Sequence, residues 1–138
     1  MNRRNILQAI AGGIGPAALL QATAGSRILS QTLGADAVKV EHAAYGEGQI
    51  YFDGPTDQLK SLTAGSVRLN PGSEPHPPHQ HPEEEIMLVT EGHGRIVVDG
   101  KTTEVGPGAM MYCAGGKVHG IHNTGDAPLL FYFYKWRA

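Results

Sequence analysis

The chain has 138 residues, 41% of them hydrophobic, which suits a single domain with one core. Its formal charge of −2, without clustered Lys or Arg, argues against a nucleic-acid partner. The single cysteine, Cys113, excludes an internal disulfide, and the 19 Gly and 9 Pro favour short strands and frequent turns.

Residues 1–24 have the pattern of an export signal. Arg3 and Arg4 precede an apolar run that begins at Ile6 and ends in the small-x-small pattern Ala22-Thr23-Ala24. Several glycines and Pro16 break this run, so we expect no permanent membrane span. The pattern resembles a twin-arginine signal and predicts a periplasmic or secreted protein. The alternative is an N-terminal amphipathic helix that belongs to the domain.

Residues 25–37 are predicted to form a spacer, or an arm that crosses onto a neighbouring subunit. Residues 38–138 are predicted to form an all-β domain, because short β-rich runs alternate with turn residues and indicate an antiparallel sandwich or barrel. Asp99-Gly100 suits a type I′ hairpin turn. The apolar tail 129–136 and exposed strand edges suggest pairing between subunits, and we expect a homodimer. The predicted strands span 38–45, 49–52, 66–70, 85–90, 95–98, 102–105, 110–112, 118–122 and 129–136.

The stretch from Pro71 to Glu85 carries the residues with ligand chemistry. Alternate side chains of an extended chain share a face, so His79 and His81 point the same way and Glu85 returns to that face. A fourth ligand is expected from elsewhere, and His119 is the best candidate, near the start of a late strand after a Gly-rich turn. Imidazole and carboxylate ligands suit a divalent transition metal: Fe, Mn, Co, Ni, Cu or Zn.

The same parity suggests the lining of an apolar pocket. Met87 and Val89 should face inward with Glu85, and Ile121 should share the face of His119. Met110 or Tyr112 is a candidate for the neighbouring strand, and Tyr112 and Arg95 are candidates to orient a substrate. His76 is read as an exposed loop residue or a fifth ligand, and His122 as facing away from the metal. Cys113 is read as a core or pocket-wall residue, with a thiolate ligand as the alternative.

Two motifs resemble those of the cupins. The first combines Gly72, His79, His81, Glu85 and Gly92, with a spacer of six residues after Gly72 where five are usual. The second runs from Gly106 to Asn123, and His119 and Asn123 have the family's His-x-x-x-Asn spacing; Cys113 stands where proline is usual. The resemblance implies a single-domain jelly-roll β-barrel in which His79, His81, Glu85 and His119 hold the metal.

Four protein ligands on an octahedral ion would leave two positions for a small-molecule substrate, or for substrate and dioxygen. We therefore favour a metal-dependent oxidoreductase of the dioxygenase or oxidase type, with Fe or Mn as the preferred ion. The alternatives are a metal-dependent isomerase or lyase acting on a sugar or hydroxy acid, and a non-catalytic binding protein. The fold alone cannot choose among them, because this barrel carries many functions.

Overall fold

The computed structural model describes residues 26–138, and the predicted signal, residues 1–24, lies outside them. Residues 26–138 form short strands and a 3₁₀ turn (η2, Ala35–Ala37). None of residues 26–138 belongs to a helix long and apolar enough to cross a membrane. The strands are β1 (Glu41–Ala43), β2 (Gly46–Gly54), β3 (Ser61–Leu69), β4 (Glu84–Glu91), β5 (Gly94–Val98), β6 (Lys101–Val105), β7 (Met110–Cys113), β8 (His119–His122) and β9 (Leu129–Arg137).

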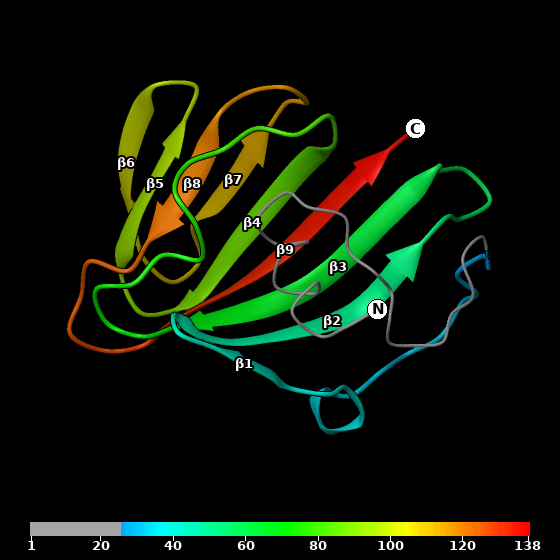
Figure 1. Cartoon of the computed structure of the whole chain (residues 1–138), viewed down its shortest axis with the longest axis horizontal. Coiled ribbons are helices and arrows are strands. Elements are labelled where there is room, and N and C mark those ends of the chain that lie inside the picture. Colours follow the sequence, from blue (N-terminus) through cyan, green and yellow to red (C-terminus); the bar gives the residue numbers. More distant parts are fainter. Residues whose placement is uncertain (1–25) are drawn as a thin grey trace.

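The strands form two antiparallel sheets that enclose one core (Figure 1). The larger sheet has the order β1-β2-β3-β9-β4-β7, and the smaller has the order β6-β5-β8. After β4 the chain crosses to the small sheet for β5 and β6, returns for β7, crosses again for β8 and returns for β9. The all-β fold predicted from the alternation of short runs and turns is therefore confirmed.

The core lies between the sheets, because the inward-facing side chains of both sheets pack together there. Phe131 and Phe133 of β9 are fully buried at its centre, with Met87 and Val89 of β4 beside them. Ile96 of β5 and Ile121 of β8 close the core from the small sheet. Burying one such side chain contributes roughly 1.5–3 kcal/mol, so these two rows hold the sheets together.

The predicted hairpin at Asp99-Gly100 is confirmed. Both residues have positive φ, 49° and 84°, as a type I′ turn requires. The turn sets the register of β5 on β6 and pairs Val98 with Lys101.

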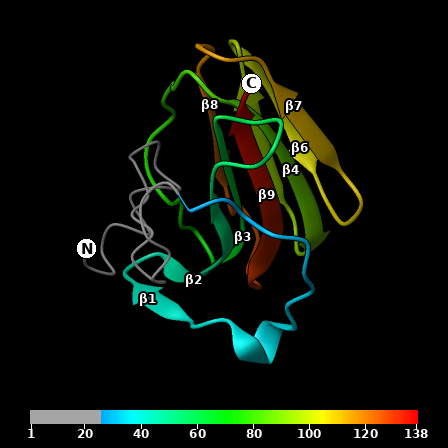
Figure 2. The ribbon, with the colours of Figure 1, turned by 90° about the vertical axis from the view of Figure 1, so that its right-hand side faces the viewer.

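The predicted strands differ from the observed ones mainly at their ends. The run 38–45 contributes only β1, whereas β3 begins at Ser61, five residues before the predicted start. The tail 129–136 is not a free edge, because β9 pairs with β3 on one side and β4 on the other. Residues 26–37 pack against the same chain (Figure 2): Ile28 N donates to Pro55 O, and the Gln49 amide donates to Ala35 O and Val38 O.

Candidate metal centre

The loop between β3 and β4 brings two histidines to the small sheet. His79 forms a β-bridge with His119 on β8, in which His79 N donates to His119 O at 3.0 Å and His119 N donates to His79 O at 2.8 Å. The following turn is tied down as well, because Gly116 N donates to His81 O at 2.7 Å. The backbone thus fixes both ends of the His79-Gln80-His81 segment against the strand that carries His119.

Two imidazoles converge on one carboxylate oxygen. Nε2 of His81 lies 2.9 Å from Glu85 Oε1, and Nε2 of His119 lies 3.1 Å from the same atom. The other ring nitrogen of each histidine faces a backbone carbonyl at 3.1 Å, that of Glu83 for His81 and that of Lys117 for His119. Without an ion, each Nε2–H donates to Glu85. With a metal bound, a proton on Nδ1 would satisfy each carbonyl and free each Nε2 lone pair for the ion, the tautomer that metal-binding histidines use.

His79 supplies a third nitrogen with no hydrogen-bond partner. Its Nε2 is buried and accepts or donates no hydrogen bond. Burial first, and then the neighbouring His76, His119 and His81, together lower the pKa of His79 to about 3, so the ring is neutral. One ligand atom from each of His79, His81 and His119 lies within 4.8 Å of the others, and this group could hold a metal ion. A buried, unpaired lone pair is costly, and a metal ion would satisfy it.

The Nε2–Oε1 distances of 2.9 and 3.1 Å are those of ordinary hydrogen bonds. They also leave His81, His119 and Glu85 close enough to ligate one ion.

Glu85 is ionised in spite of its burial. The residue is 2% exposed, and burial alone would raise its pKa. Hydrogen bonds from His119 and His81 outweigh that penalty and bring the pKa down to about 2. This buried carboxylate places an anionic oxygen against the imidazoles of His81 and His119.

Two neighbours predicted as possible ligands pack against the histidine rings instead. The ring centroid of His76 lies 3.8 Å from that of His79, and His76 itself is half-buried. Sγ of Cys113 is buried 3.4 Å from Nδ1 of His119, on the side of the ring opposite its Nε2. Cys113 therefore supports the His119 ring as a pocket-wall residue.

Three of the side chains predicted to face inward do so, and the others do not. Met87, Val89 and Ile121 are buried, as predicted. The prediction that Met110 or Tyr112 lines the pocket is wrong, because these side chains are 65% and 55% exposed on the outer face of the sheet. The Tyr112 hydroxyl donates to Glu84 there. β7 pairs Cys113 directly with Glu85, so its inward residues are Cys113 and Met111.

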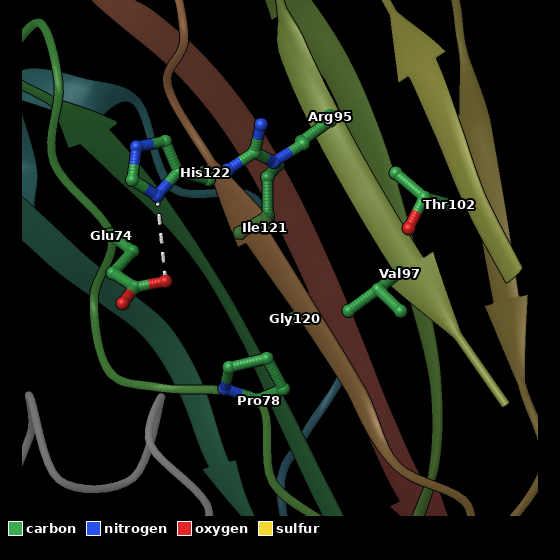
Figure 3. A pocket seen from close by; sticks show the side chains of 8 residues that line it. All are labelled: Glu74, Pro78, Arg95, Val97, Thr102, Gly120, Ile121 and His122. Atoms are coloured by element: carbon green, nitrogen blue, oxygen red, sulfur yellow. Dashed lines mark hydrogen bonds and ion pairs between the residues drawn. The ribbon is translucent and has the colours of Figure 1, made fainter. Parts of the chain in front are cut away.

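Arg95 and His122 line a separate pocket of about 310 Å³ on the outer face of the small sheet (Figure 3). They are register partners on β5 and β8, and His122 lies 3.5 Å from Glu74 of the loop. His122 faces away from the three imidazoles, as predicted. Arg95 is not placed to orient a substrate at the metal centre.

The patterns in the sequence did not point to Lys135, which lies beside Glu85 in the sheet. Lys135 is 4% exposed and pairs in register with Glu85. Burial lowers its pKa, and the carboxylates of Glu85, Glu83 and Asp53 oppose that shift. The available signal was parity, since Lys135 follows Phe131 and Phe133 at intervals of two along one strand.

Comparison with known proteins agrees with this fold. A cupin domain family model matches residues 65–134. An RmlC-like cupin from Shewanella frigidimarina has a TM-score of 0.66 and 18% identity, covering 80% of this chain and 93% of that one.

Two further solved structures share the fold. One is described as a predicted oxalate decarboxylase from Thermotoga maritima, with a TM-score of 0.64 and 21% identity over 78% of this chain and 100% of that chain. The other is a polyketide cyclase from Streptomyces resistomycificus, with a TM-score of 0.64 and 23% identity over 78% and 80% of the two chains. At these identities the likeness concerns the fold, while the family match spans half of the chain. The chain belongs to the cupin family.

Proposed function

We propose that His79, His81, Glu85 and His119 hold a divalent transition metal, with Fe or Mn favoured, and that the protein is a metal-dependent oxidoreductase. The reaction would be of the dioxygenase or oxidase type on a small molecule. The observation that carries the proposal is the buried Nε2 of His79, unpaired beside two Nε2 atoms that already converge on Glu85. A redox-capable ion held there supplies electron transfer and polarises a substrate oxygen.

The protein groups have distinct tasks in this proposal. Glu85 offsets one positive charge of the ion, and the carbonyls of Glu83 and Lys117 hold the rings of His81 and His119 in orientation. The apolar row behind them, which includes Met87 and Phe133, keeps water from the interior. Four protein ligands would leave two positions of an octahedral ion for the substrate.

A second candidate, a metal-dependent isomerase or lyase, is favoured by one observation. Lys135 is buried beside Glu85 in the sheet, and burial lowers its pKa toward that of a proton acceptor. The names of the structural neighbours, which include a predicted oxalate decarboxylase and a polyketide cyclase, favour neither candidate, because one fold carries several chemistries.

The decisive experiment identifies the metal and the reaction separately. Elemental analysis of protein purified from the native exported fraction names the ion. Oxygen consumption is then measured with Fe- or Mn-loaded protein on a panel of enediols, phenols, thiols and oxalate. Uptake with any of them supports the oxidoreductase. If no oxygen is consumed but anaerobic protein with Zn or Ni isomerises a ketose or hexuronate, the second candidate stands.

We further propose that residues 1–24 are a twin-arginine signal and that the mature protein is periplasmic or secreted. Export of this kind carries folded proteins, which would let the metal be loaded beforehand. A fusion of residues 1–35 to a reporter should be exported, and changing both Arg3 and Arg4 to Lys should stop it. Continued export of the Lys variant would reject the assignment.

We also propose a homodimer. Its support is the outer face of the large sheet, where Met110, Tyr112 and Tyr134 are exposed beside one another across β7, β4 and β9. An exposed apolar face of this kind is typical of an interaction surface. Met110→Glu should convert the dimer to a monomer in analytical ultracentrifugation, whereas a wild-type protein that is already monomeric would refute the proposal.

A further inference from the structure

The outer pocket, on the outer face of the small sheet, is separate from the metal centre. Its wall is the loop before β4, which is attached to β8 at both ends. Asn123 N donates to Ser73 O at 2.9 Å, and His79 forms its bridge with His119. Between these attachments five loop residues, 74–78, lie opposite only three residues of β8, and three of the five are prolines, which have no N–H to donate. The loop therefore cannot follow the strand residue by residue, and a pocket of about 310 Å³ lies between loop and sheet (Figure 3).

A polar row at one end of this pocket contains an unpaired cation. Arg95 of β5 is the register partner of His122 on β8, and Glu74 of the loop lies beyond His122, with 3.5 Å between Oε2 and Nδ1. Within residues 26–138 the Arg95 guanidinium makes no hydrogen bond or ion pair. Glu104 is its register partner on β6, but the Arg95 side chain extends away from β6, toward His122 (Figure 3). The row thus presents an unpaired guanidinium and, one residue away, a carboxylate that contacts only an imidazole.

The neighbouring row provides apolar contact and space. Val97 of β5 has Thr102 and Gly120 as its register partners, and Pro78 of the loop lies over Gly120. A Cβ atom on Gly120 would come within 3.1 Å of the Pro78 Cα atom, so a side chain there would crowd the loop. Small molecules bind preferentially in pockets that combine apolar surface with a few polar groups that fix their orientation.

The two charges of the polar row define the class of ligand. A guanidinium binds a carboxylate through two parallel hydrogen bonds, and a carboxylate accepts hydrogen bonds from an ammonium group. A simple anion would meet the like charge of Glu74, and a simple cation would meet that of Arg95, whereas a zwitterion satisfies both groups. Cβ atoms of register partners stand about 5 Å apart, so one small molecule can span Arg95, His122 and Glu74.

We propose that the outer pocket binds a free apolar amino acid, whose carboxylate contacts Arg95 and whose ammonium group contacts Glu74. The side chain of the ligand then lies against Val97 and Pro78. This site shares no residue with the metal centre, so its occupant is distinct from the substrate of the proposed oxidoreductase.

Calorimetry on the full-length protein tests the proposal with alanine, valine, leucine and methionine. For the amino acid that binds most tightly, the amine without the carboxylate and the acid without the ammonium group are measured as well; for leucine these are 3-methylbutylamine and 4-methylpentanoate. Each should bind at least about tenfold more weakly, because a hydrogen bond to a charged group accounts for about one power of ten in affinity or more. The preference over the amine should vanish in Arg95→Met, and the preference over the acid should vanish in Glu74→Gln.

Arg68→Met is the matched control, since it removes an exposed arginine from the large sheet and should leave both preferences intact. Amino acids also chelate metal ions, so the wild type is measured again after its metal has been removed with EDTA, and binding should persist. The comparison of amino acid, amine and acid requires no variant, so a folding defect in a variant leaves the test standing.

Three results overturn the inference: no binding of any of the four amino acids, equal binding of the amino acid and its amine or acid by the wild type, or loss of binding when the metal is removed. Undiminished preferences in Arg95→Met and Glu74→Gln overturn it as well. A wild-type protein that holds no metal refutes the metal site alone and leaves this inference in place.

Discussion

Replacing Glu85 by Gln should destabilise the metal-free protein by about 3 kcal/mol at pH 7. Glutamine resembles the protonated acid, so the substitution removes the stabilisation that lowers the Glu85 pKa from 4.5 to about 2. Each unit of pKa shift corresponds to about 1.4 kcal/mol. A pKa depressed in the folded state stabilises the protein above the unfolded value, and this contribution is lost as the pH falls from 4.5 to about 2.

Urea unfolding of metal-free wild type and Glu85→Gln measures this difference directly. The two unfolding free energies should differ at pH 7 and converge as the pH approaches 2. Glu91→Gln is the control: it removes an exposed carboxylate that pairs with Arg68 at 3.0 Å, and it should cost no more than about 1 kcal/mol. Equal stability of Glu85→Gln and wild type at pH 7 would show that His81 and His119 do not stabilise an ionised carboxylate.

Three further predictions concern the metal and the core. His81→Ala should abolish stoichiometric metal binding measured by elemental analysis, whereas His122→Ala, which alters the outer pocket, should retain it. The free energy of unfolding of the metal-free protein, measured in urea, should fall as the pH drops from 6.5 toward 3, because His79 takes up a proton in the unfolded chain but, with a pKa of about 3, not in the folded one. Metal affinity should fall over the same pH range. Stability and affinity that do not change with pH would contradict both expectations. Phe131→Ala should lower the free energy of unfolding by about 3–5 kcal/mol, since it leaves a cavity at a fully buried position.

Local spacing was enough to predict the His79, His81 and Glu85 side of the centre, because these residues lie close together in an extended segment. His119 was predicted from its setting, and the β-bridge to His79 accounts for its approach. Parity within a single strand also predicted Met87 and Val89 correctly. The triplet and the Met87 and Val89 pair share one condition, which is that the relevant geometry is set within a few residues of chain. His119 is the exception, because its bridge joins residues far apart in the sequence.

The misses depend on which strands become neighbours. Met110 and Tyr112 were chosen without knowing that β7 aligns Cys113 with Glu85, and a shift of one residue exchanges the two faces of a strand. Asp53 faces inward only because of a bulge in β2, for which the residues around Tyr51 give no signal. The inward direction of Lys135 follows from the alternation along its strand. Its position beside the candidate site depends on pairing with Glu85, 50 positions earlier in the sequence.

The position of β9 has a consequence for how the molecule is made. β3 and β4 follow each other in the sequence, yet in the sheet they are separated by β9, which is synthesised after both. A folding chain can therefore bring the histidines and Glu85 together while the large sheet still has a gap one strand wide. Closing that gap is a late, long-range step, and long-range pairing is slow. Until β9 inserts, the candidate metal ligands lie beside this gap, and the same step that brings in Lys135 closes it.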